Sequence, residues 1–183
     1  MKLHLGCWHR YFPGWVHVDL CDMEHIDYKT GVDDLSMIPD EAADIVYASH
    51  VLEYFDRFQA RDVLKEWRRV LKPGGTVRLA VPDFESITKL YQQTGDVEKC
   101  VGLLYGRMEI QTETGPQMLY HKTVWDFDFL KRVLEECGFG DVRRYDWRDT
   151  EHAEVDDHSQ AYYPHMQKDT GILMSLNVEA DRK

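Results

Sequence analysis

The stretch LHLGCWHRYFPGW, residues 3–15, decides how this chain folds. Its apolar start leads into Gly6, the pattern of a strand followed by the tight turn of a nucleotide-binding site. Such motifs place a second glycine two residues later, where the backbone approaches the ligand, but that position holds Trp8. The segment WVHVDL, residues 15–20, alternates and contains β-branched residues, which predicts a second strand. Because a crossover with a full helix needs ~10–12 residues, at most one or two helical turns fit into residues 6–14.

The rest of the chain alternates between strand and helix periodicity. This alternation predicts one doubly wound, Rossmann-like α/β domain over residues 1–183, with 106–122 and 148–171 as loop insertions. Right-handed crossovers place the carboxyl ends of the strands on one side of the sheet, where ligands bind. The expected strands cover residues 2–5, 15–20, 43–49, 76–81, 141–147 and 172–180, and the expected helices cover 56–71, 84–92, 97–105 and 126–136.

Composition, charge and cysteine pattern exclude several classes of protein. No apolar run approaches the ~20 residues of a membrane span, and the first residues resemble a strand rather than a signal peptide, so we expect a cytoplasmic protein without membrane contact. The net charge of −11 repels phosphate backbones and disfavours general nucleic-acid binding. The cysteines form no CxxC pair, which fits a reducing compartment. They are Cys7, Cys21, Cys100 and Cys137.

Two groups of metal-ligand residue types occur, but neither predicts a metal site. Cys7 and His9 are separated by a single residue, where zinc ligands usually have two to four between them. Asp156, Asp157 and His158 could hold a metal, but a solvated lid is the preferred interpretation. We therefore expect no bound metal.

Asp19 ends the second expected strand and is a candidate ligand-binding residue. A carboxylate there can accept hydrogen bonds from both hydroxyls of a ribose, although alone it could equally cap a turn. NAD would need a glycine-rich turn and a helix N-terminus for its pyrophosphate, and this chain lacks both the GxGxxG motif and room for that helix. S-adenosylmethionine carries adenosine without phosphate, so the residues favour it over a dinucleotide.

Five segments carry a family resemblance: LHLGC (3–7), GWVHVDL (14–20), ADIVYASHVLEYF (43–55), EWRRVLKPGGTVRLAVPDF (66–84) and ECGFGDV (136–142). They are similar to class I S-adenosylmethionine-dependent methyltransferases, especially the small members of type 11. The resemblance implies a mostly parallel, seven-stranded sheet with an antiparallel last strand. It also implies S-adenosyl-L-methionine as the cofactor.

The resemblance further implies a set of site residues. Gly6 and Cys7 would pass beside the methionine part of the cofactor, and Asp19 would hold the ribose. A loop carrying Asp34 would border the adenine, and the end of the third strand would form the floor of the site, with Glu53 just beyond. The cofactor-binding residues expected on this basis are Gly6, Cys7, Trp8, Asp19, Leu20, Asp34, Leu35, Ser49 and His50.

Methyl transfer to an oxygen also needs a base with a pKa near neutrality, for which histidine is the natural side chain. His50 and His121 are the candidate catalytic residues because both precede elements that bring them to the strand ends. His152 and His158 lie in the late polar loop and are weaker candidates.

Two departures from the family pattern leave two functions open. The family's GCG is GCW here, with Trp8, and its VLEH or VLHH is VLEY, with Tyr54. The leading hypothesis is a methyltransferase acting on an unidentified small-molecule or saccharide acceptor. The alternative is a degenerate methyltransferase fold that serves as a non-catalytic binding or interaction protein. The assembly we consider is a homodimer.

Overall fold

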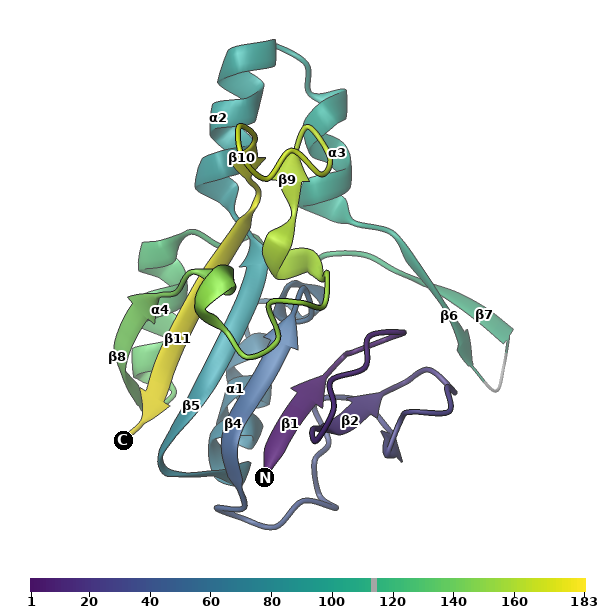
Figure 1. Ribbon diagram of the computed structural model, residues 1–183, viewed down its shortest axis with the longest axis vertical. Coiled ribbons are helices and arrows are strands. Elements are labelled where there is room, and N and C mark those ends of the chain that lie inside the picture. Colours follow the sequence, from purple (N-terminus) through teal and green to yellow (C-terminus); the bar gives the residue numbers. More distant parts are fainter. Residues whose placement is uncertain (113–114) are drawn as a thin grey trace.

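A central sheet of seven strands organises the computed structural model, which describes residues 1–112 and 115–183 (Figure 1). The strands are β1 (Lys2–Leu5), β2 (Val16–Asp19), β3 (Tyr28–Lys29), β4 (Ala43–Ser49), β5 (Leu71–Pro82), β8 (Phe139–Arg144) and β11 (Ser175–Arg182). Their order in the sheet is β3-β2-β1-β4-β5-β11-β8. The first five pair in parallel, and β11 pairs antiparallel with both β5 and β8. The expected Rossmann-like sheet with an antiparallel last strand is therefore confirmed.

The helices lie on one face and at one end of this sheet. In Figure 1, α1 (Gln59–Val70) and α4 (Phe127–Glu136) lie behind the sheet, whereas α2 (Phe84–Thr94) and α3 (Glu98–Tyr105) project beyond the end of β5. Three short 3-10 helices are η1 (Leu52–Tyr54), η2 (Trp147–Asp149) and η3 (His158–Gln160). Two small hairpin sheets pair β6 (Met108–Thr112) with β7 (Gly115–Leu119), and β9 (Tyr162–Tyr163) with β10 (Ile172–Leu173).

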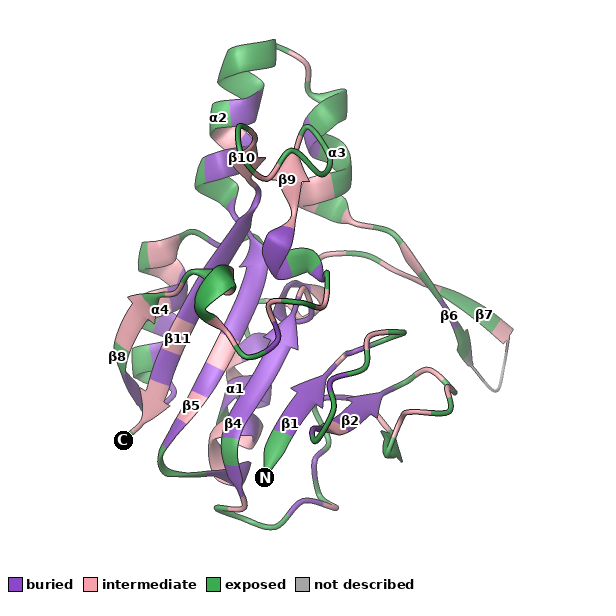
Figure 2. Cartoon of the chain, viewed as in Figure 1, coloured by how far each residue is buried: buried purple, intermediate pink, exposed green. Residues whose placement is uncertain are grey.

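Helix α1 shows how the sequence pattern produces the core. Its buried residues recur at spacings of three and four, so one stripe of the helix faces the sheet. The indole of Trp67 is fully buried in this stripe, and its Nε1–H donates to the carbonyl of Val32 over 2.8 Å. Figure 2 shows the result: β4 and β5 are buried along most of their length, while the ends of α2 and α3 are largely exposed.

The face of the sheet opposite α1 is covered by aromatic side chains in place of a crossover helix. Residues 6–15, all of which the structure describes, form turns without a helix, as expected from their number. The ring of Phe12 stacks between His4, with ring centroids 4.1 Å apart, and His152, at 4.9 Å. His152 comes from the segment between β8 and β9, which crosses in front of β5 and β11 in Figure 1. Burial lowers the pKa of His4 well below its ordinary value and that of His152 to about 4.

The segments expected as loop insertions contain regular structure. Residues 106–122 form a hairpin of β6 and β7, although residues 113–114 lie outside the described part of the chain. Residues 148–171 contain η3, part of η2 and the short strand β9, which pairs with β10. These elements are short and polar, so pairing and packing produce them rather than hydrophobic periodicity.

Three strands differ from their expected bounds. The expected strand 141–147 is β8, which begins at Phe139 and ends at Arg144. The strand expected over 172–180 is divided into β10 and β11 at Met174, whose N–H bonds to the carbonyl of Ala161. Strand β5 includes the Lys-Pro-Gly-Gly turn, where Gly74 has a φ of 74° and the pairing with β4 shifts register.

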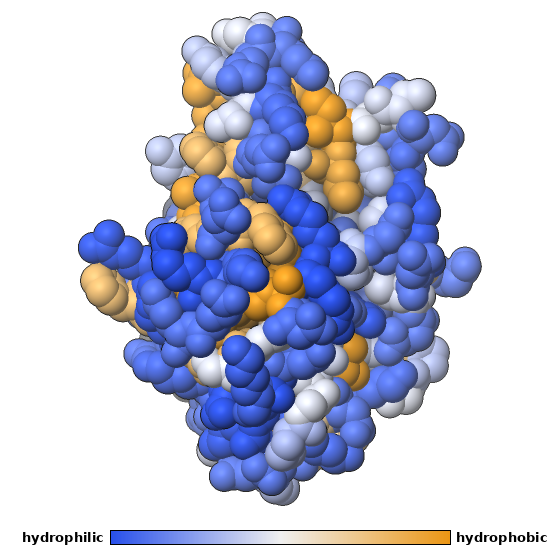
Figure 3. Space-filling model, turned by 90° about the vertical axis from the view of Figure 1, so that its left-hand side faces the viewer, coloured by the Kyte–Doolittle hydropathy of each residue, from blue (hydrophilic) through white to orange (hydrophobic). Residues whose placement is uncertain are grey.

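The side of the molecule at the left of Figure 1, where β8 and α4 lie, is mainly hydrophilic, with small hydrophobic patches (Figure 3). In the described residues, every helix is too short or too polar to cross a lipid bilayer.

Candidate active site

A cavity of about 250 Å³ opens where β1, β2 and β4 end, and we call it the first cavity. Gly6 begins the turn after β1 with a φ of 62°, and its N–H donates to the carbonyl of Val18 over 2.8 Å. A Cβ at this position would collide with the side chain of Val51, so only glycine fits. The turn therefore brings bare backbone to the cavity wall, as a bound cofactor requires.

Asp19 lies at the end of β2 and connects the first cavity to the turn after β1. Its Oδ2 accepts the N–H of Trp8 over 2.7 Å, and its Oδ1 accepts the N–H of Cys21 over 2.8 Å. Each carboxylate oxygen has two lone pairs, so both oxygens can still accept a ribose hydroxyl. The side chain is thus held rigidly in place by the backbone and remains competent to bind a sugar.

Trp8 has a left-handed backbone conformation with a φ of 47°. This conformation costs roughly 1–2 kcal/mol in a residue with a Cβ. The indole is 43% exposed and stacks edge-on against His9, with centroids 4.3 Å apart. It lies outside the lining of the first cavity, so the space beside Asp19 is open.

The expected cofactor-binding residues fall into three groups, of which one, Trp8 and Ser49, lines a second cavity described below. The lining of the first cavity includes Gly6, Asp19, Leu20 and His50. Three others lie elsewhere: Cys7 is buried, Asp34 is exposed, and Leu35 is fully buried in the core. Burial and the charge of Asp19 raise the pKa of the Cys7 thiol to about 12. On the side where Asp34 and Leu35 were expected, the described wall is formed by residues 31–33.

A second cavity of about 290 Å³ adjoins the first, and the two share Gly6, His50, Tyr54 and Met108 in their walls. Trp8, Ser49 and His121 line this second cavity, so the turn, the end of β4 and the second candidate base meet there. Joined, the two cavities reach the size of ordinary small-molecule sites.

The sequence analysis did not identify several wall residues. Arg10 and Arg107 line the second cavity, and the hairpin contributes Met108, Ile110 and Leu119 to the first. The alternation of Met108 and Ile110 is the only signal of the hairpin wall in the sequence, and it is too short to be distinctive.

Three titratable side chains form a buried cluster beneath the second cavity. Oε1 of Glu53 lies 3.5 Å from Nδ1 of His50 and 3.8 Å from Nε2 of His121. Glu53 is fully buried, and neither carboxylate oxygen has a hydrogen-bond partner among the described residues. Two further contacts orient the rings: His50 Nε2 lies 3.2 Å from Oγ of Ser175, and His121 Nδ1 lies 3.3 Å from the carbonyl of Leu103.

Burial determines the protonation of this cluster. It raises the pKa of Glu53 to about 8 and lowers that of His50 well below its ordinary value. It also lowers the pKa of His121, although the carbonyls of Leu103 and Leu104 oppose this shift. Because the Leu103 carbonyl can only accept a hydrogen bond, Nδ1 of His121 carries the hydrogen and Nε2 keeps a free lone pair. Near neutral pH the cluster therefore contains a protonated carboxyl group and two uncharged imidazoles.

The groups present suit a cofactor rather than a metal ion. Among the described residues, no group of three or more His, Cys, Asp or Glu side chains is arranged to hold a metal. The glycine turn, the free lone pairs of Asp19 and the apolar wall of Val51, Phe55 and Ile110 fit an adenosine.

Comparisons with known proteins agree with this reading. Residues 16–79, from the start of β2 into β5, match a family model described as a methyltransferase domain. No curated protein matches the chain. A solved S-adenosylmethionine-dependent methyltransferase from Archaeoglobus fulgidus is 17% identical, with a TM-score of 0.59 over 99% of this chain and 85% of that one. Another, from Mesorhizobium loti, is 16% identical, with a TM-score of 0.54 over 99% of this chain and 90% of that one.

A third similar structure, from Thermotoga maritima, is described as a methyltransferase and a possible histamine N-methyltransferase. It is 14% identical, with a TM-score of 0.57 over 100% of this chain and 82% of that one. At such identities these likenesses show the shared fold. Together with the family model they confirm the resemblance to class I S-adenosylmethionine-dependent methyltransferases. Residues 16–79 are similar to a methyltransferase domain, and S-adenosyl-L-methionine is the expected cofactor.

Proposed function

We propose that this protein transfers a methyl group from S-adenosylmethionine to a small-molecule or saccharide acceptor. The observation that carries the proposal is the pair of adjoining cavities at the carboxyl ends of the strands. The first joins the Gly6 turn to Asp19, and the second holds both candidate bases. The proposal treats residues 1–183 as a single methyltransferase-like domain of a cytoplasmic protein.

The cofactor, when bound, supplies a methyl group already activated by the sulfonium charge. The task of this chain is then to align the acceptor with that methyl group, which is the largest catalytic term in such transfers. We assign the ribose hydroxyls to Asp19 and the methionine end to the backbone around Gly6. The side chains of Leu20 and Val51 would exclude water from the adenosine.

An oxygen acceptor must lose a proton as the methyl group arrives, and we assign its removal to His50 or His121. Both imidazoles are uncharged near neutral pH, so both can accept a proton. Protonated Glu53 lies behind them, with Oε1 3.5 Å from His50 and 3.8 Å from His121, and keeps its proton while it orients the two rings. Glu53 is therefore a positioning residue in this scheme.

Calorimetry with S-adenosylhomocysteine tests the cofactor site directly, because binding needs no acceptor. We expect saturable binding of one molecule per chain. A panel of hydroxyl and amine acceptors incubated with methyl-labelled S-adenosylmethionine then tests transfer. Absence of S-adenosylhomocysteine binding would contradict the proposal.

The alternative, a non-catalytic binding protein, has one observation in its favour. Trp8 has a left-handed backbone conformation at the position where the family pattern has glycine. This conformation lowers stability, and no contact of the indole with the described residues evidently compensates for it. The two functions differ in one measurement. A degenerate fold would fail to bind S-adenosylhomocysteine in the wild type, and would gain binding after Trp8→Gly if the indole blocks the site, whereas an enzyme would bind it in both.

A further inference from the structure

The wall of the second cavity has a charge opposite to that of the whole chain. The chain carries a net charge of −11. The described residues that line this cavity nevertheless include no carboxylate. Its ionisable side chains, apart from Tyr54, are Arg10, Arg107, His50, His121 and His158. Such local segregation of charge in a cleft attracts ligands of the opposite sign.

Arg10 is held at the wall without being neutralised. Its backbone N–H donates to the carbonyl of Cys7 over 3.0 Å, which fixes the residue in the turn after β1. Its Nε donates to the backbone carbonyl of Asp156, also over 3.0 Å. Among the described residues, the guanidinium has no ion pair with a carboxylate. Its positive charge also reaches the candidate base, because it contributes to the lowered pKa of His50.

Arg107 reaches the cavity from another segment of the chain, between α3 and β6. Gly106 precedes it with a φ of 54°, and a Cβ on that glycine would collide with the ring of His121. The close approach places the Arg107 backbone beside the second candidate base. Arg107 is exposed, and in the described part of the chain it too has no ion pair with a carboxylate.

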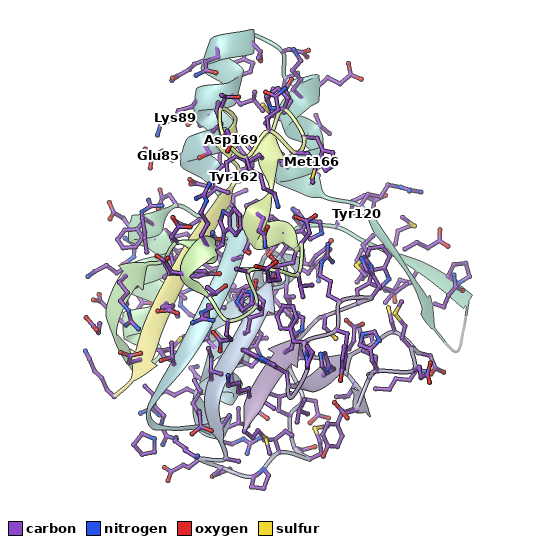
Figure 4. The ribbon with its side chains drawn as sticks, viewed as in Figure 1. Glu85, Lys89, Tyr120, Tyr162, Met166 and Asp169 are labelled. Atoms are coloured by element: carbon purple, nitrogen blue, oxygen red, sulfur yellow. The ribbon has the colours of Figure 1, made fainter. Side chains whose placement is uncertain are left out.

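One nearby carboxyl group, that of Glu53, lies beneath the cavity and is protonated near neutral pH. Other carboxylates lie farther out, in a third cavity of about 490 Å³ that shares Arg10 and His158 with the second. Tyr162 and Met166, labelled in Figure 4, belong to its wall. Two of its three carboxylates already have partners. Asp156 accepts Lys168 Nζ over 2.9 Å, and Asp157 accepts the hydroxyl of Tyr47 over 2.5 Å. Among the described residues, none of these carboxylates forms an ion pair with Arg10 or Arg107, and Asp156 is paired with Lys168 instead.

We propose that the methyl acceptor carries an anionic oxygen group, a carboxylate or a phosphate, that binds Arg10 and Arg107 in the second cavity. This inference rests on the proposed methyltransferase function. The amino-acid end of the cofactor is a less suitable occupant, because it is a zwitterion whose ammonium group would face a wall without carboxylates. A bidentate guanidinium matches the planar geometry of a carboxylate or phosphate.

Matched pairs of charged and neutral probes test the proposal by calorimetry on the protein saturated with S-adenosylhomocysteine. The pairs are benzoate with benzamide, and glucose 6-phosphate with glucose. We expect each charged probe to bind at least tenfold more tightly than its neutral partner. Arg10→Gln and Arg107→Gln should each reduce that preference several-fold. Arg132→Gln, on the exposed face of α4, changes the net charge equally and should leave the preference unaltered.

Three results would overturn the proposal. Equal or undetectable binding of charged and neutral probes would do so, as would a preference that survives both cavity substitutions. The third result would show that Arg10 binds the carboxylate of the cofactor rather than the anionic group of the acceptor. If Arg10→Gln weakens S-adenosylhomocysteine but not 5′-methylthioadenosine, which lacks the amino-acid end, Arg10 serves the cofactor instead. Failure of the wild type to bind S-adenosylhomocysteine would instead reject the methyltransferase function itself, before any probe is added.

Discussion

Glu53→Gln should make the protein more stable, and the gain should grow with pH. The carboxyl group is fully buried without hydrogen-bond partners among the described residues, and its pKa is raised from 4.5 to about 8. Because the folded-state pKa is the higher one, the contribution of Glu53 to stability is fully present below pH 4.5. It is lost as pH rises towards 8, since the unfolded chain releases its proton first.

The magnitude follows from the size of the shift. Each pKa unit corresponds to about 1.4 kcal/mol, so the difference between wild type and Glu53→Gln should approach ~5 kcal/mol above pH 8. Near pH 7 the expected gain is ~3 kcal/mol. Glutamine has nearly the same shape and cannot ionise, so packing around it should change little.

Urea unfolding of both proteins at intervals from pH 4.5 to 8.5 measures this difference. Glu135→Gln, on the exposed face of α4, is the matched control and should differ from the wild type by the same small amount at every pH. Parallel stability curves for the wild type and Glu53→Gln would refute the reasoning. So would a variant less stable than the wild type at pH 8.

Four further outcomes can be measured. The free energy of unfolding should fall as pH drops from about 6.5 to 4, because the unfolded chain protonates its histidines first, and His152→Phe should reduce that fall. Asp19→Ala should weaken S-adenosylhomocysteine binding by ~1–3 kcal/mol in calorimetry. An unchanged affinity would show that Asp19 does not belong to the site. Trp8→Gly should raise stability by ~1 kcal/mol through relief of the left-handed backbone and change that affinity less than tenfold; a large gain in affinity would show that the indole blocks the site. For any acceptor identified, turnover that survives both His50→Ala and His121→Ala would reject these residues as bases, whereas loss in one identifies it.

Strands β1 and β4 could be predicted to the residue because each is an apolar segment that ends at a polar or glycine residue. The class of cofactor followed from what the first turn lacks: room for a helix and a second glycine. The hairpin of β6 and β7 could not be predicted in the same way. Its strands pair with each other in polar surroundings. Their apolar residues form part of the wall of the first cavity, a contact that the sequence pattern does not indicate.

The candidate site could be predicted only where the pairing of adjacent strands determines which residues lie close together. Gly6 and Asp19 end adjacent strands, so their proximity follows from parallel pairing. Arg10 and Arg107 are distant in sequence and line one cavity only because the turn after β1 and the segment after α3 both border it. Glu53 was noticed beside His50, but its burial, which raises its pKa, and its 3.8 Å approach to His121 arise only in the folded chain.

The hairpin has a consequence for how long a bound cofactor stays. Its strands form their own two-stranded sheet, separate from the central one, and in Figure 1 they extend away from it. A two-stranded hairpin is marginally stable by itself, so its position depends on side chains such as Ile110, which is 7% exposed at the first cavity. Outward movement of the hairpin would open that cavity while every hydrogen bond of the central sheet stays intact. Residence time would then be set by the hairpin, and cofactor exchange could be slowed by tethering it without altering any residue that touches the sugar.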